Sequence, residues 1–347
     1  MQREYIIRNH VKLELRVIPL VSAQLVKAIL SGYQKVLGKT VDIEAFGLSY
    51  HIYEQNSYYF PSKPLIVFLN FLHHTLSTKQ LVDFYTYIIN NFAIPHYLAQ
   101  CSSKPTNVRD SLQKMIEISR IQAPSAQITL EENSDIFWLK RTQVIHGLDD
   151  TPSDFVFVLF VQLWINTMLG KAVKIHKIHT PSKSLFTLGA LTVTNPQTDI
   201  HYQKGFTSVG LLTSLLERET TLPNEYFENL QSRLEPIDFL DSVKHAMDSY
   251  LGTENYSIDR IAGVLGVSVR QFQYNLEAHG VTYQKLKDEV IQHNAKWLIL
   301  QNQSNLSTIT TQLGYSSITQ FSRSIKRITG MSPRAYKQHL FNEQLGS

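Results

Sequence analysis

The stretch LGYSSITQFSRSIKRITGMSP (Leu313–Pro333) decides the fold of the last quarter of this 347-residue chain. A glycine-aromatic-serine turn leads into a segment whose Phe321 and Ile325 share one helical face, with Ile318 expected one turn earlier on the same inner side. The opposite face is polar and basic, and aspartate and glutamate are absent from residues 301–342. Because a carboxylate there would repel a polyanion, the pattern favours a helix that lies in a groove of DNA over an ordinary surface helix.

The same pattern occurs 48 residues earlier, in SIDRIAGVLGVSVRQFQYNL (Ser257–Leu276). Each copy opens with a residue that can cap a helix and continues with apolar residues at helical spacing. Each then reaches a glycine suited to a positive φ, Gly266 or Gly314. A serine two residues later, Ser268 or Ser316, is expected to cap a second helix.

Two short helices joined by a tight turn form a helix-turn-helix, whose second helix can enter the major groove of DNA. The sequence predicts one such motif at about 257–278 and another at about 305–328, joined by a long helix over 282–301. If both second helices face one side, they can read successive major grooves about one helical turn apart. A single copy would fit an ordinary helical hairpin equally well, whereas the duplication favours DNA binding.

The formal net charge of +4 is distributed unevenly along the chain. Residues 1–249 contain 23 basic and 23 acidic side chains, whereas residues 250–347 contain ten basic and six acidic ones. The whole positive excess therefore lies in the region that carries the two predicted motifs, which suits a polyanionic partner.

Three segments resemble the AraC/XylS family of transcription regulators: SIDRIAGVLGVSVRQFQYNLEAHGVTYQKL, Ala295–Ile299 and LGYSSITQFSRSIKRITGMSPRAYK. The resemblance covers about residues 239–340 and implies an all-α DNA-binding domain, residues 236–347, with two helix-turn-helix motifs joined by a long helix. It also implies transcription activation beside bacterial RNA polymerase. The chain has Tyr274, Ile291 and Thr310 where family members often have arginine, arginine and alanine. Tyr274 can contact a thymine methyl group but cannot make the bidentate guanine contact of an arginine.

Outward-facing side chains of the two second helices are the expected base-reading residues: Arg270, Gln273, Tyr274, Thr319, Gln320 and Arg323. The expected phosphate contacts are Ser257, Lys326, Arg327, Arg334 and Lys337. The first motif and the linking helix, 254–300, carry five charges of each sign. The second motif is therefore expected to supply most of the attraction to phosphate.

Residues 1–235 are predicted to form a separate α+β domain. Amphipathic helices are expected at Ser22–Gly38 and Thr106–Arg120, and strands at 127–132, 136–144 and 171–179. An acidic, proline-bearing passage places the domain boundary near Glu235. The order of elements resembles the arabinose-binding type of N-terminal domain in longer AraC/XylS members. That resemblance implies a small-molecule effector, with unknown binding residues, and a homodimer.

Other chemistry has little support in the sequence. The single cysteine, Cys101, excludes an intramolecular disulfide and a multi-cysteine metal site, and it lies in no nucleophile motif. We expect no metal, no cofactor and no catalytic residue. The apolar Phe155–Leu169 segment is expected to be a buried helix, and the chain a cytoplasmic bacterial protein without a signal peptide or membrane contact. The alternative is an alkyl-transfer or amidotransferase-like enzyme domain fused to the DNA-binding module.

Overall fold

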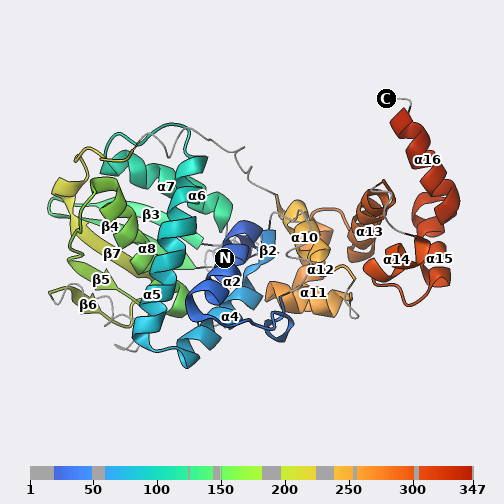
Figure 1. Cartoon of the computed structure of the whole chain (residues 1–347), viewed down its shortest axis with the longest axis horizontal. Coiled ribbons are helices and arrows are strands. Elements are labelled where there is room, and N and C mark those ends of the chain that lie inside the picture. The colour runs from blue at the N-terminus through green and yellow to red at the C-terminus, as the bar shows by residue number, and fades with distance from the viewer. Residues whose placement is uncertain are drawn as a thin grey trace, which may run out of the picture. The chain divides into compact units, whose positions relative to one another are not determined.

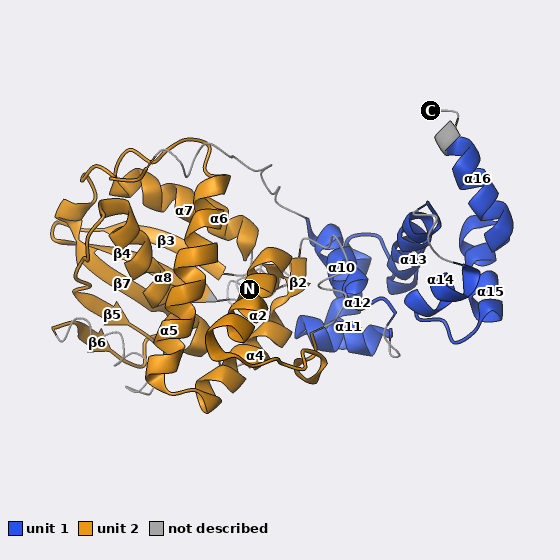
Figure 2. Ribbon diagram, in the orientation of Figure 1, with its two compact units in different colours: residues 1–16, 51–57, 238–347 blue, residues 17–50, 58–237 orange. Residues whose placement is uncertain are grey.

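The computed structural model describes residues 19–48, 59–123, 126–143, 149, 151–181, 197–223, 238–252, 256–300 and 305–345. These residues form two compact units, and the division between the larger and the smaller falls between residues 237 and 238 (Figure 2). The predicted boundary near Glu235 lies outside the described residues. Each unit is considered by itself below.

The larger, N-terminal unit contains a five-stranded sheet in the order β3-β4-β7-β5-β6. The strands are β3 (Ala126–Glu132), β4 (Ile136–Gln143), β5 (Lys177–His179), β6 (Asp199–His201) and β7 (Thr207–Leu212). Strand β4 pairs antiparallel with both β3 and β7, β5 pairs antiparallel with β7, and β5 and β6 run parallel. Gly210 of β7 lies opposite Trp138 of β4, and a Cβ at Gly210 would lie 2.9 Å from the indole ring. The glycine therefore makes room for the tryptophan on this face of the sheet.

The same unit also contains several helices (Figure 1). They are α2 (Ala23–Leu37), α4 (Ser62–Thr75), α5 (Thr78–Ile88), α6 (Ile94–Gln100), α7 (Val108–Gln122) and α8 (Thr151–Leu169). A two-stranded ribbon, β1 (Leu20–Ser22) with β2 (Tyr59–Pro61), and three short helical turns, η1 (Glu44–Phe46), η2 (Ile89–Ala93) and η3 (Thr213–Leu215), complete the unit. Local signals set the helix starts, since Ser22 and Asn107 accept hydrogen bonds from backbone amides of α2 and α7. The mixture confirms the predicted α+β class.

Helix α8 is the central helix of the N-terminal unit. Among the described residues it alone is long and apolar enough to cross a membrane by length and composition. Most of its apolar side chains are nevertheless buried against α4, α5, α7 and β7. The side chains of Val158, Val161, Trp164, Ile165 and Met168 are fully buried. Its apolar composition is therefore explained by its place in the core of a folded unit.

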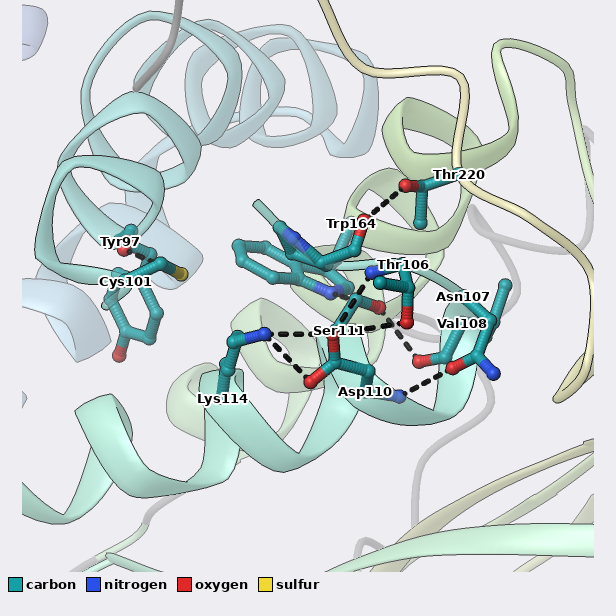
Figure 3. Close-up of polar contacts among 11 residues, drawn as sticks. Tyr97, Cys101, Thr106, Asn107, Val108, Asp110, Ser111, Lys114, Trp164 and Thr220 are labelled. Carbon is teal, nitrogen blue, oxygen red and sulfur yellow. Dashed lines mark hydrogen bonds and ion pairs between the residues drawn. The ribbon is translucent and has the colours of Figure 1, made fainter. Parts of the chain in front are cut away.

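Polar contacts fix the start of α7 and attach it to α8 (Figure 3). The Asp110 carboxylate accepts from the Thr106 amide at 2.9 Å and pairs with Lys114 at 2.7 Å. The Trp164 indole N–H of α8 donates to the Ser111 hydroxyl of α7 at 3.3 Å. Buried Trp164 thus has the hydrogen-bond partner that its polar N–H needs inside a protein core.

The smaller, C-terminal unit is helical. It consists of α10 (Phe239–Asp248), α11 (Ile258–Leu265), α12 (Val269–Ala278), α13 (Tyr283–Leu300), α14 (Leu306–Gln312), α15 (Ile318–Thr329) and α16 (Pro333–Leu345). Helix α13 packs against α10 and also against α14, α15 and α16, so it contacts both ends of the unit (Figure 1). Its buried residues include Leu286, Val290, Ile291, Ala295 and Ile299.

Candidate nucleic-acid interface

The two helix pairs of the C-terminal unit, α11–α12 and α14–α15, start with equivalent caps. The Ser257 hydroxyl accepts from the Arg260 amide at 3.3 Å, and the Asn305 side chain accepts from the Thr308 amide at 2.9 Å. Each cap satisfies a backbone donor that the first turn of a helix leaves unpaired. The two caps are 48 residues apart, as the sequence repeat predicts.

The turns inside the two pairs also share their backbone hydrogen bonds. The Val267 amide donates to the Ala262 carbonyl at 3.0 Å, and 48 positions later the Tyr315 amide donates to the Thr310 carbonyl at 3.0 Å. The glycines in these turns, Gly266 and Gly314, have φ values of +74° and +76°, a region that other residues rarely adopt.

Thr310 is buried, and a local hydrogen bond accommodates its hydroxyl in α14. Its hydroxyl donates to the Leu306 carbonyl at 2.7 Å, which satisfies the additional polar group. Ile291 is also buried, in α13. At that position α13 therefore contributes an apolar contact to the core.

Equivalent residues of the second helices, α12 and α15, are 49 positions apart, whereas those of the first helices are 48 apart. The turn before α15 is therefore one residue longer than the turn before α12. Ser268 caps α12 by accepting from an amide, and the equivalent residue at the start of α15 is Ser317. The prediction that Ser316 caps this helix is therefore wrong, since Ser316 is the additional residue of the turn. Phe272 and Phe321 are the equivalent core anchors, and each is at most 1% exposed.

The structure exposes all six predicted base-reading side chains, on α12 and α15: Arg270, Gln273, Tyr274, Thr319, Gln320 and Arg323. Counting from the buried phenylalanine of each helix makes Tyr274 and Arg323 equivalent, because each follows its phenylalanine by two residues. Tyr274 is 53% exposed. The second helices therefore offer different chemistry at matching positions, a phenol in the first and a guanidinium in the second.

Ile318 does not lie in the core as the sequence predicted. It is 44% exposed and is the first residue of α15, three residues before Phe321. Leu306, the first residue of α14, is 38% exposed in the same way. Both residues fit the helical period, but the first residue of a helix can extend past the packed face. An exposed isoleucine beside Thr319 adds an apolar group to the surface that carries the base-reading candidates.

The expected phosphate contacts lie at several places on the C-terminal unit. Ser257 is the N-cap of α11, where backbone amides also point outward, and Lys326 is exposed in the last turn of α15. Arg334 and Lys337 are exposed on α16, and the Lys337 ammonium lies 5.8 Å from the Phe341 ring centroid. These groups are placed where an anion can approach from solvent.

Arg327, also expected at phosphate, is already paired within the protein. Its guanidinium forms a bidentate ion pair with Asp288 of α13, in which the second nitrogen lies 2.7 Å from a carboxylate oxygen. This ion pair holds the pKa of Asp288 below its ordinary value. No local spacing predicts this pair, because its partners are 39 residues apart. Arg327 therefore anchors α15 on α13, and Asp288 offsets its charge.

A second acidic residue of α13 is paired as well. Glu289 lies 3.0 Å from the ammonium of Lys244 on α10, and Lys287 donates to the Tyr256 carbonyl at 2.9 Å. The carboxylates of Asp288 and Glu289 are thus neutralised inside the unit, while Arg270, Arg323 and Lys326 have no ion pair with any described residue. Arg323 and Lys326 on α15 and Arg270 on α12 therefore keep their charges available to a partner outside the unit.

The enzyme alternative predicts a reactive cysteine or a metal cluster. Cys101 is buried after the last turn of α6, with its thiol donating to the Tyr97 carbonyl at 3.5 Å (Figure 3). Among the described residues, no group of three His, Cys, Asp or Glu side chains could hold a metal ion.

Residues 261–339 match the family model described as a helix-turn-helix domain. The comparison with curated proteins gave no match. Three solved structures are similar. The transcriptional regulator CdpR from Pseudomonas aeruginosa is 16% identical over 90% of this chain and 98% of its own, with a TM-score of 0.39. A DNA-binding transcriptional dual regulator from Escherichia coli K-12 is 21% identical over 32% of this chain and 99% of its own, with a TM-score of 0.28. The C-terminal domain of AraT, a response regulator from Geobacillus stearothermophilus, is 22% identical over 31% of this chain and 88% of its own, with a TM-score of 0.27.

Proposed function

We propose that this chain, a DNA-binding transcription regulator with an AraC-type helix-turn-helix domain at its C-terminus, binds two successive major grooves of its operator, one with each helix pair. The observation that carries this proposal is the repeated geometry of the two pairs. Caps, turn hydrogen bonds and buried phenylalanines recur, and α12 and α15 both present exposed polar side chains. Helix α13 is the long helix that would join the two motifs.

The two motifs would contribute unequally to binding. The second would supply most of the phosphate contacts through Lys326, Arg334 and Lys337, and a guanine-reading side chain through Arg323. The first would read its half-site through Arg270, Gln273 and Tyr274, of which Tyr274 favours a thymine methyl group. Support for this asymmetry comes from the absence of aspartate and glutamate from residues 301–342 and from the equivalence of Tyr274 with Arg323.

The N-terminal part, up to about residue 235, would be the effector-binding and dimerisation domain, and residues 236–347 the DNA-binding domain. A small molecule bound in the N-terminal part would shift the population between DNA-competent and incompetent states, so that the protein activates transcription together with RNA polymerase. We place the regulator in the bacterial cytoplasm as a homodimer. The alternative is an alkyl-transfer or amidotransferase-like enzyme domain fused to the DNA-binding module.

The experiment that tests this function is selection of genomic DNA fragments bound by the purified chain, compared with Arg323→Ala. The matched control is Lys79→Ala, which removes one exposed positive charge from α5 in the N-terminal unit. We expect two enriched half-motifs about one helical turn apart, retained by Lys79→Ala and weakened by Arg323→Ala at one half-motif. Equal enrichment by all three proteins would contradict readout by Arg323.

A separate comparison tests the asymmetry between the motifs. Arg270→Ala and Arg323→Ala are measured on one selected operator over a range of salt concentrations. Arg323→Ala is expected to cost more affinity because its helix carries the larger share of unpaired positive charge. Comparable losses from the two substitutions would show that the two motifs contribute equally.

A further inference from the structure

The start of α15 carries a large apolar side chain in an exposed, polar setting. Ile318, the first residue of the helix, is 44% exposed, and the residues on either side of it, 316–317 and 319–320, are polar and exposed. The equivalent residue of α12 is Val269, which is smaller and partly buried. Of the two second helices, only α15 therefore begins with a large apolar group that faces solvent.

Polar contacts fix the helix end that carries Ile318. The Ser317 hydroxyl caps α15 by accepting from the Gln320 amide at 3.3 Å, and the Ser316 hydroxyl donates to the Gln320 side-chain oxygen at 2.9 Å. Phe321, in the same turn, is fully buried and holds the helix on the core. An isoleucine in a helix is largely restricted to one χ1 rotamer, because its β-carbon is branched. The methyl groups of Ile318 are therefore already ordered, so a contact with them costs little side-chain entropy.

A single isoleucine suits a partner that offers one methyl group rather than a broad apolar surface. In a helix-turn-helix, the N-terminal residues of the second helix reach the base edges of the major groove. The C5-methyl group of thymine is the apolar group that bases present in that groove, and cytosine lacks it. Burial of one such carbon corresponds to a gain in affinity of about fourfold.

Arg323 indicates where this thymine would lie in the half-site. It follows Ile318 by five residues, which is about 7.5 Å along the helix axis at a rise of about 1.5 Å per residue. Successive base pairs of DNA are about 3.4 Å apart, so this distance spans about two steps. We therefore expect the thymine within about three base pairs of the guanine that Arg323 would contact.

We propose that Ile318 contacts the C5-methyl group of one thymine in the half-site of the second motif, and so selects thymine over cytosine at that position. This inference rests on the proposed function, because it requires α15 to enter the major groove. It adds a specificity-determining apolar contact to the polar contacts of Thr319, Gln320 and Arg323.

The test replaces thymidine by deoxyuridine, one position at a time, in both half-sites of a selected operator. Deoxyuridine pairs with adenine as thymidine does and lacks only the methyl group. Affinities of the full-length wild type, Ile318→Ala and Leu306→Ala are measured by fluorescence anisotropy. Leu306 provides the matched control because it is the first residue of α14 and is 38% exposed, so its truncation removes an exposed apolar side chain without changing α15.

We expect one thymidine at which deoxyuridine weakens wild-type binding about threefold to fivefold. Ile318→Ala should bind the thymidine operator more weakly by a similar factor and should not distinguish the two operators. Its affinity for the deoxyuridine operator should stay close to that of the wild type, which also shows that the variant is folded. Leu306→Ala should keep the wild-type preference for thymidine. An effect of deoxyuridine on the shape of the duplex would persist in Ile318→Ala, so the comparison separates the two causes.

The inference is overturned if no thymidine in either half-site shows this difference with the wild type, or if Ile318→Ala keeps the difference. Operator binding without any preference for the methyl group would overturn this inference alone and leave the proposed function intact. A wild-type chain that selects no operator would overturn the proposed function, and this inference with it.

Discussion

Gly314 lies where the turn of the second helix pair packs on the main chain that follows α10. Its φ is +76°, and a Cβ at this position would lie 3.0 Å from the Gly252 Cα and 3.3 Å from the Gly252 N and C atoms. Substitution by alanine therefore has two separate costs. The new residue must adopt a left-handed backbone conformation, and its methyl group meets main-chain atoms that cannot rotate away.

Gly330, at the end of α15, provides a matched control for the first cost. Its φ is +75°, and an added Cβ would meet no atom within 4 Å. Gly330→Ala should therefore lower the free energy of unfolding by about 1–2 kcal/mol, the cost of the left-handed conformation alone. Gly314→Ala adds the displacement of packed backbone, about 1–3 kcal/mol, so its total should be about 2–5 kcal/mol.

Hydrogen exchange of the full chain, followed by mass spectrometry on peptides from α14 and α15, measures the local opening free energy in each variant. Gly314→Ala should lose more protection than Gly330→Ala and should also bind operator DNA more weakly, because the contact with Gly252 helps to position the second helix pair. Equal losses of protection in the two variants would refute the argument from the close backbone contact. A larger loss of protection in Gly330→Ala than in Gly314→Ala would refute the described surroundings of both glycines.

Three further predictions concern single side chains. Arg323→Ala should reduce the slope of log K against log salt by about 1 and cost about 1–3 kcal/mol of operator affinity, measured by fluorescence anisotropy; an unchanged slope would exclude a charged contact with DNA. Asp288→Asn breaks the ion pair with Arg327 and should lower the free energy of unfolding of the C-terminal unit by about 1 kcal/mol or less, since the pair is partly exposed. A gain in stability, measured by calorimetry, would contradict this prediction. Burial lowers the pKa of His73 to about 4 from an ordinary value of 6.5, so the unfolded chain binds the proton more readily between these values. The stability of the N-terminal unit should therefore fall by about 2 kcal/mol, after allowance for solvent screening, as pH drops from about 6.5 to 4. Denaturant unfolding of the His73→Gln variant, measured over the same pH range, should lack this loss of stability.

The sequence was sufficient for features that depend on neighbouring residues. Ser257, Asn305 and Ser268 cap helices because a side-chain oxygen reaches an amide three residues away, and Gly266 and Gly314 occupy the positive-φ positions that their spacing predicted. The same local reasoning failed where one residue changed the register. The longer second turn moved the cap from Ser316 to Ser317, and the position of Ile318 at a helix end exposed a side chain whose period matched the core.

By itself, therefore, the sequence determined the helix pairs and their exposed polar faces, because caps, glycine turns and helical periods act over a few residues. The tertiary structure alone decided that Arg327 pairs with Asp288, which makes the arginine an anchor between α15 and α13. It also decided that the Trp164 indole N–H of α8 meets the Ser111 hydroxyl of α7. These groups are far apart along the chain, and they meet only after the helices and the sheet have packed, since no local spacing specifies such contacts.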